Sequence, residues 1–240
     1  MSLRYLFLSL FFSTFLAAQQ KPVVVLELFT SQGCSSCPPA DAVLEDIKNN
    51  SNPEEIIPLS YHVDYWDYIG WKDPYASAQF TNKQRTYGRK FYSSSIYTPQ
   101  LVINGKEHIV GSDKANILKK IDQKLHRKKV INSVKIKDVS KKDNAIDFSY
   151  QIEGAIKNKS IHFILVLNEK TTHVKRGENS NRTLSNNNIV VKEDIKALTN
   201  SKGNYELEIP KNIAEKDSLK LVVLISDKNL DINTGTQYNL

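Results

Sequence analysis

The chain has 240 residues, of which 40% are hydrophobic and 25% are charged, as in an ordinary globular protein. Nine glycines and eight prolines exclude a fibrous or low-complexity chain, and two cysteines exclude a disulfide-dense scaffold. The net charge of +7 weakly favours acidic partners, but no zinc-finger, Walker or RNA-recognition motif accompanies it, so we predict no nucleic-acid partner.

Residues 1–18 have the layout of a secretory signal peptide. Arg4 provides the positive start, a mostly apolar run follows, and Ala17 and Ala18 are the small residues at the cleavage site. The apolar run is shorter than the roughly 20 residues of a membrane span. We therefore predict a periplasmic or secreted protein without membrane association after cleavage. The alternative is an uncleaved anchor.

Beyond this segment, strand-like and helix-like stretches alternate up to residue 129, which predicts an α/β domain. The predicted elements are a buried strand over 23–29, a helix with apolar residues at 40, 43, 44 and 47, a strand over 56–63, an insertion over 64–96 with a helix over 76–90, a hairpin over 101–110, and a final helix capped by Asp113.

The pattern changes at residue 130. Short β-rich runs separated by turn residues follow, which predicts a small antiparallel β-sandwich over 130–240. The stretch 176–188 is too polar for a strand and is predicted as a loop.

Cys34 and Cys37 lie where the first strand gives way to a helix. Unpaired backbone N–H groups and the helix dipole stabilise a thiolate at a helix N-terminus. With two residues between them, the second sulfur can reach the first, so we predict Cys34 as the exposed nucleophile and Cys37 as the resolving residue. The predicted activity is thiol–disulfide exchange with a protein or small-molecule substrate, without a cofactor.

Two other interpretations of the cysteine pair stay open. A structural disulfide would make the chain a non-catalytic binding module, although so short a loop gains little stability. Alternatively, the two thiols with His62 and His108 would handle copper or zinc, although their spacing is not that of a zinc finger.

The segment Tyr97-Thr98-Pro99 precedes the predicted hairpin. A proline at the start of a strand takes either the cis or the trans form. In the cis form, a loop beside the dithiol exposes backbone groups that pair with an extended substrate. We therefore predict a catalytic role for Pro99 and substrate contacts for Tyr97 and Thr98.

The order of strand, CxxC, helix, Thr-Pro, hairpin and final helix resembles the thioredoxin fold. The blocks at residues 27–41 (ELFTSQGCSSCPPAD), 61–66 (YHVDYW), 70–73 (GWKD), 97–100 (YTPQ), 104–105 (NG) and 176–179 (RGEN) are similar to the DUF1223 family of uncharacterised secreted proteins. This resemblance implies a thioredoxin-like domain over 22–129, with a central mixed sheet flanked by helices, and an appended β-rich domain. Thioredoxins carry Gly-Pro where this chain has Ser35-Ser36, so their redox potential is not carried over.

Five further residues are candidates for the site. In thioredoxin-like proteins an acid near the position of Glu27 assists proton transfer, which implies that Glu27 lies behind Cys37; a carboxylate satisfied by a lysine is the alternative. His62 and Trp66 follow the second strand, where ligands gather in α/β sheets, so we predict substrate contacts; a structural histidine and a hydrophobic plug are the alternatives.

The block at 176–179 supplies the last two candidates. We predict that Glu178 and Asn179 fold back to the dithiol and contact the substrate, with an ordinary surface loop as the alternative.

Overall fold

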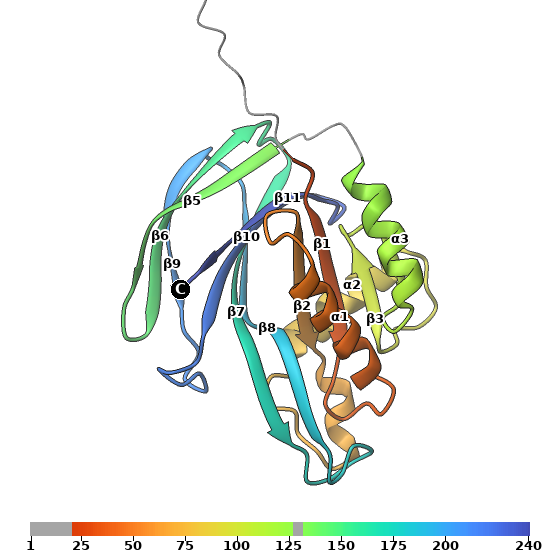
Figure 1. Ribbon diagram of the computed structural model, residues 1–240. Coiled ribbons are helices and arrows are strands. Elements are labelled where there is room, and N and C mark those ends of the chain that lie inside the picture. Colours follow the sequence, from red (N-terminus) through yellow and green to blue (C-terminus); the bar gives the residue numbers. More distant parts are fainter. Residues whose placement is uncertain (1–20, 127–131) are drawn as a thin grey trace, which may run out of the picture.

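The computed structural model describes residues 21–126 and 132–240 (Figure 1). The predicted signal peptide lies outside the described residues. The elements are β1 (Val24–Thr30), α1 (Pro38–Asn50), β2 (Ile56–His62), η1 (Asp64–Ile69), α2 (Ala78–Lys90), β3 (Gln100–Ile103), β4 (Glu107–Val110), α3 (Lys114–Leu125), β5 (Asn132–Lys141), β6 (Ala145–Gly154), β7 (Lys159–His173), β8 (Thr183–Ala197), β9 (Lys202–Glu208), β10 (Leu219–Asp227) and β11 (Ile232–Asn239). Within this part of the chain, no helix has the length and hydropathy that crossing a membrane requires.

Eight strands form one mixed sheet in the order β11-β10-β7-β8-β2-β1-β3-β4 (Figure 1). Strands β1 and β2 are parallel, whereas β3 is antiparallel to both β1 and β4. A single register pair, Ser60 with Ile189, joins β2 to β8. The strands β5, β6 and β9 form a second, antiparallel sheet. The prediction of a mixed sheet with helices and a β-rich C-terminal half is confirmed at this level. The large sheet takes strands from both sides of residue 130, and a domain boundary there stays a prediction.

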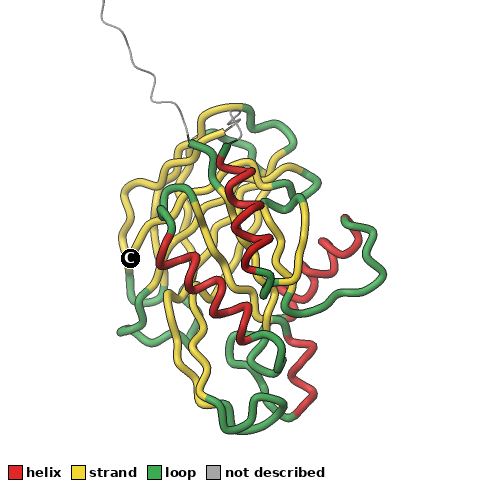
Figure 2. Tube along the Cα trace, turned by 45° about the vertical axis from the view of Figure 1, so that its right-hand side comes forward, coloured by secondary structure: helices red, strands yellow, loops and turns green. Residues whose placement is uncertain are grey.

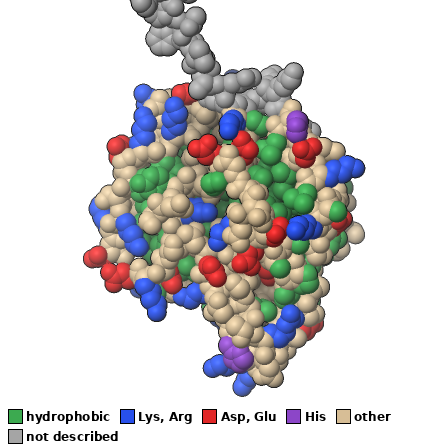
Figure 3. All heavy atoms as spheres, viewed as in Figure 1, with side chains coloured by type: hydrophobic (Ala, Val, Ile, Leu, Met, Phe, Trp, Pro, Cys, Tyr) green, Lys and Arg blue, Asp and Glu red, His purple; other side chains and the backbone are tan. Residues whose placement is uncertain are grey.

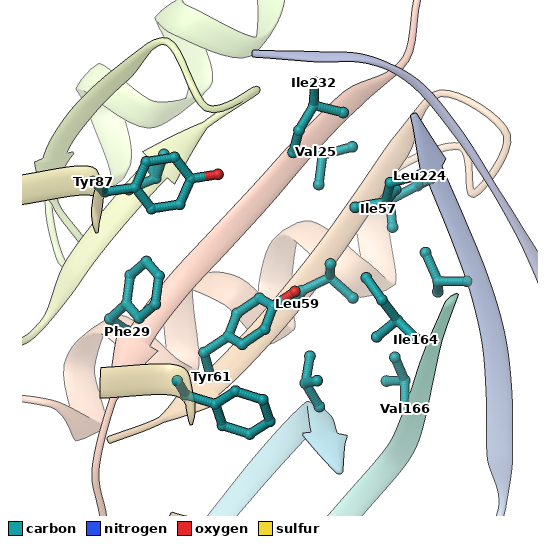
Figure 4. Packing of buried hydrophobic residues seen from close by; sticks show 14 of the residues in the cluster. Val25, Phe29, Ile57, Leu59, Tyr61, Tyr87, Ile164, Val166, Leu224 and Ile232 are labelled. Atoms are coloured by element: carbon teal, nitrogen blue, oxygen red, sulfur yellow. The ribbon is translucent and has the colours of Figure 1, made fainter. Parts of the chain in front are cut away.

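Strand β1 is buried on both faces of the large sheet. Its successive side chains point in opposite directions, and an apolar cluster covers each face. Val24, Leu26 and Leu28 pack in one apolar cluster with residues of α1 and α3, two of the helices that lie over the strands in Figure 2. Val25 and Phe29 face the other way, into the cluster that holds residues of α2 and is shown in Figure 4. Burial on both faces explains why the strand is apolar almost throughout.

The second sheet packs against β7 and β10 of the large sheet through a further apolar cluster. At its centre the ring of Phe163 lies 5.5 Å from that of Phe148 and stacks on Tyr205 at 4.0 Å between centroids. These three residues come from β7, β6 and β9, so the aromatic contacts join the two sheets face to face.

Two features of the C-terminal half differ from the prediction. The polar stretch 176–188, predicted as a loop, is a strand from Thr183 onward. Asn186 donates to Asp41, and the Asn187 amide oxygen accepts from Lys48, so polar pairing takes the place of apolar burial. Strand β11 is absent from the prediction. Its place in the sheet comes from its pairing with β10, not from a strand pattern in its own sequence.

Candidate functional site

Cys34 and Cys37 form a disulfide at the junction of β1 and α1, with their Cα atoms 5.4 Å apart. The turn is closed by the Cys34 amide, which donates to the Ser31 carbonyl at 3.1 Å. Cys37 is the N-cap residue, and prolines follow it in the first turn, where a missing N–H costs nothing. The sequence thus places both sulfurs at a helix N-terminus, as predicted.

The segment before β3 lies directly against the disulfide. The Thr98 hydroxyl is 3.3 Å from the Cys34 sulfur and accepts a hydrogen bond from the Trp66 indole at 2.8 Å. The Thr98–Pro99 peptide bond is cis. Tyr97 instead directs its hydroxyl to His108 Nδ1 at 3.1 Å. Of this segment, Thr98 therefore has the direct contact with sulfur.

Residues 178 and 179 reach back to the disulfide from far along the chain. The Glu178 carboxylate accepts a hydrogen bond from the Ser35 amide at 3.0 Å. The Asn179 side chain, which is fully buried, donates to the carbonyls of Gln32 and Cys34, each at 2.9 Å. The fold-back predicted for this block is present, and we call residues 177–179 the covering segment.

Both sulfur-bearing residues are fully buried, with 0% exposure. The prediction of an exposed nucleophile is therefore wrong for the oxidised protein. The cause is close packing: a Cβ added at Gly33 would lie 3.2 Å from Trp66, and one at Gly177 would lie 3.4 Å from Ile69 and Trp71. Glycine at position 33 therefore lets Trp66 pack closely against the disulfide turn, and glycine at position 177 lets the covering segment pack against Ile69 and Trp71.

A buried acid lies one helical turn after Cys37. Asp41 lies four residues along α1, on the same helix face as Cys37. Its carboxylate accepts hydrogen bonds from Thr30 and Asn186, each at 3.3 Å. Burial raises the pKa of Asp41 to about 7, against the opposing effect of His62. Asp41 is not among the predicted residues, although its four-residue spacing from Cys37 on a predicted helix was the available signal.

His62 ends β2 beside Thr30 and is fully buried. Its Nδ1 is 2.7 Å from the Asp73 carboxylate, which also accepts the Gln32 amide at 2.8 Å. Burial lowers the pKa of His62, but Asp73 outweighs this and the net pKa is raised. His62 is held by Asp73 inside the fold and belongs to β2 of the sheet, so its predicted substrate contact is corrected to a role inside the fold.

Glu27 does not lie behind Cys37. It shares the face of β1 with Val25 and Phe29, whereas α1 covers the opposite face. Its carboxylate is 2.7 Å from the Lys83 ammonium and accepts the Tyr87 hydroxyl at 2.5 Å, both from α2. The prediction of a proton relay through Glu27 is therefore wrong, and the alternative of a carboxylate satisfied by a lysine is confirmed.

Lys83 also pairs with Glu193 of β8 at 2.8 Å, and Glu193 contacts His162 of β7 at 2.9 Å. Neighbouring positive charge overcomes burial and lowers the pKa of Glu193 to about 2. We call Glu27, Lys83, Glu193 and His162 the buried ionic network. It joins β1 to β8 and β7, beside the single register pair of β2 with β8.

Among residues 21–126 and 132–240, no three His, Cys, Asp or Glu side chains are grouped as a metal site requires. His108, the fourth member of the alternative metal site, packs against Phe91 with ring centroids 5.0 Å apart.

Comparison with known proteins places these features in a family. The crystal structure of protein AGR_C_4864 from Agrobacterium tumefaciens, a structural genomics target, is 27% identical over 92% of this chain and 95% of that chain, with a TM-score of 0.65. Two crystal structures of β-glucosidase from Kluyveromyces marxianus, one in complex with glucose, are 14% identical over 46% and 55% of this chain and 14% and 18% of theirs; their TM-score of 0.23 carries no argument. The search of curated proteins gave no match.

The model of the family described as "Protein of unknown function (DUF1223)" matches residues 25–226, a range that includes the disulfide and the covering segment. The chain therefore belongs to the DUF1223 family.

Proposed function

We propose that this protein carries out thiol–disulfide exchange through Cys34 and Cys37. The observation that carries the proposal is the position of the disulfide at the N-terminus of α1, with the Thr98 hydroxyl 3.3 Å from the Cys34 sulfur. Helix N–H groups and a hydroxyl donor both stabilise a thiolate at Cys34. A loop of two residues adds little to stability by chain entropy, which disfavours a purely structural purpose.

The proposed reaction starts from the reduced protein. The Cys34 thiolate attacks a substrate disulfide, forms a mixed disulfide and releases one substrate thiolate. The Cys37 thiolate then attacks the Cys34 sulfur, releases the second substrate thiolate and restores the Cys34–Cys37 disulfide. Two electrons pass to the substrate, whose thiolates take up two protons. The reverse sequence oxidises a dithiol.

Asp41 is suited to receive the proton of the Cys37 thiol in the second step. It lies one turn from Cys37, and its pKa of about 7 leaves a substantial fraction of the carboxyl unprotonated at neutral pH. His62 and Asp73 hold opposite charges in the same buried region, since the pKa of His62 is raised and that of Asp73 is lowered. This role replaces the one predicted for Glu27.

Burial of both sulfurs means that exchange requires the covering segment and η1, which carries Trp66, to move away from the disulfide. Few bonds hold the cover: Glu178 contacts Ser35, which is exposed, and Asn179 holds two backbone carbonyls. Glu178, Asn179, Trp66 and Thr98 would then line the exposed dithiol and contact a substrate.

Replacing Asn179 with alanine removes both bonds to the disulfide turn and leaves two carbonyls without their donor. We expect dithiothreitol to reduce the disulfide roughly thirtyfold faster, since the two bonds together contribute about 2 kcal/mol to the closed form. Timed thiol labelling measures the rate. The exposed Asn200→Ala variant is the control, and equal rates in the two variants would show that this residue does not close the site.

The arrangement of residues 22–126 supports a thioredoxin-like assignment for this part of the chain. The sheet order β2-β1-β3-β4 combines one parallel and two antiparallel pairs, with the CxxC motif at the end of the central strand β1. Helices α1 and α3 pack on one face and α2 on the other. An exported location, in which disulfides persist, fits this function and rests on the pattern of residues 1–18.

One observation favours a second candidate function. Complete burial of the disulfide fits a static bond in a non-catalytic binding module, whose partner would contact the outer surface of η1 and the covering segment.

A trapping experiment separates the two candidates. In the proposed mechanism, reduced Cys37→Ser protein reacts with glutathione disulfide and keeps glutathione on Cys34, because no resolving thiol is present. The reduced Cys34→Ser protein, whose remaining thiol begins the helix, serves as the matched control and should react at least tenfold more slowly. Intact-protein mass spectrometry measures both. Equal rates, or no adduct on either variant, would favour the static disulfide.

A further inference from the structure

A cavity of about 850 Å³ lies at the opposite end of α1 from the disulfide, where β5, β10 and β11 approach the helix. Four lysines line it: Lys21 before β1, Lys48 in the last turn of α1, Lys135 on β5 and Lys220 on β10. Glu54 is the one acidic residue in the described lining. Figure 3 shows Lys and Arg side chains in the middle of the face on which α1 lies.

Two of the lysines already have acidic partners. Lys21 pairs with Glu55 at 3.0 Å, and Lys135 with Glu153 at 3.8 Å. The ammonium groups of Lys48 and Lys220 instead contact neutral oxygens among the described residues. Lys48 donates to the Asn168 carbonyl at 3.1 Å and to the Asn187 amide oxygen at 2.9 Å, and Lys220 contacts the Asn188 amide oxygen at 3.4 Å.

The Lys220 side chain is held in an environment that is unfavourable for a lone charge. The residue is only 8% exposed, and burial together with the nearby Lys48 lowers its pKa to about 8. An ammonium has three N–H donors, and Lys220 directs one of them, at long range, to Asn188. The buried amide nitrogens of Asn187 and Asn188 have no hydrogen-bond partner either. Two lysines of the cavity lining thus have unused donors, and the amides that contact them have unpaired nitrogens.

From these observations we infer that the cavity binds a small organic anion, with its carboxylate or phosphate group on Lys48 and Lys220. An oxyanion would accept the unused N–H donors and supply the missing negative charge. The volume is within the range of small-molecule sites, and Val23, Val134 and Pro53 offer apolar surface to the rest of the ligand. The site is separate from the disulfide, because α1 has 13 residues and spans roughly 20 Å.

The Asn186-Asn187-Asn188 run lies behind the two lysines and is not part of the described cavity lining. Asn186 contacts Asp41 near the disulfide, whereas Asn187 and Asn188 hold the two lysines. An apolar residue at position 188 would leave the buried Lys220 ammonium without this acceptor, and one at position 187 would leave Lys48 with the Asn168 carbonyl alone, which explains amides in the middle of a sheet strand.

Thermal-shift titration and calorimetry with glycerol 3-phosphate, succinate and inorganic phosphate test the inference, with sodium chloride at equal ionic strength as the reference. We expect saturable binding of at least one organic anion, with a Kd below about 1 mM. Lys220→Gln should weaken it at least tenfold, and the exposed Lys119→Gln should not. Preference for glycerol 3-phosphate or for succinate identifies the anionic group.

Lys48→Gln supplies a second variant if Lys220→Gln fails to fold, and it should show the same loss. The inference is overturned if no anion binds better than chloride, or if both variants bind as tightly as the wild type. A Cys34→Ser protein should bind the anion normally, so failure of the exchange activity and failure of this site are distinguishable.

Discussion

Replacing Lys83 with methionine is expected to lower the free energy of unfolding by about 3–5 kcal/mol. The Lys83 ammonium lies between the Glu27 and Glu193 carboxylates, at 2.7 and 2.8 Å, and its side chain is only 8% exposed. Methionine fills the volume but removes the ammonium between two buried carboxylates, leaving Glu193 with His162 and Glu27 with the Tyr87 hydroxyl. Urea denaturation followed by circular dichroism measures the change.

The control is Lys114→Met, which removes a pair with Asp46 whose side chains are 49% and 43% exposed. A surface pair of this kind contributes less than about 1 kcal/mol. Adding Glu27→Gln and Glu193→Gln to Lys83→Met should recover part of the loss. A loss for Lys83→Met as small as that of the control would contradict the importance of the buried ionic network.

Replacing Asp41 with asparagine is expected to remove a fall in stability between about pH 4 and pH 7. The pKa of Asp41 is about 7 in the folded chain, compared with about 3.9 in an unfolded one, so the folded chain binds more protons in this interval. Stability therefore declines as the pH rises from the lower to the higher value. A difference of about three pKa units corresponds to at most about 4 kcal/mol.

Asparagine carries no charge, so the variant should equal the wild type near pH 4 and exceed it near pH 8. Urea midpoints across this range measure the effect, and the exposed Asp46→Asn, in the same helix, is the control. His62 and Asp73 remain in the variant; the raised pKa of His62 still causes stability to fall above about pH 6.5. Identical slopes for Asp41→Asn and the wild type below that value would contradict the assignment.

The locally encoded parts of the fold were predictable from the sequence. Three features act within a few residues of the chain: the apolar run of β1, the prolines that follow Cys37, and the cap at Asp113. The Asp113 side chain accepts a hydrogen bond from the Asn116 amide at the start of α3. The Asn104-Gly105 turn is also local, since both residues take the positive φ angles that such a turn requires.

The rest depends on contacts between distant segments. The bond from Asn179 to Cys34 joins residues 145 positions apart, and that from Asn186 to Asp41 likewise. No periodicity or spacing encodes such pairs, so the burial of the sulfurs and of Asp41 could not be predicted. The position of Asp41 one helical turn after Cys37 was local information, but its burial, which raises its pKa, was not. Glu27 was misplaced because its neighbours in the sequence do not reveal which sheet face α2 covers.

The equilibrium reduction potential of the Cys34–Cys37 pair, measured against glutathione redox buffers, tests the proposed exchange activity most directly. An exchanging dithiol is expected to have a potential above about −300 mV, whereas structural disulfides lie below it. We predict the higher value, with a single two-electron transition. A potential below about −300 mV would contradict the exchange reaction and leave the static disulfide as the function of the pair.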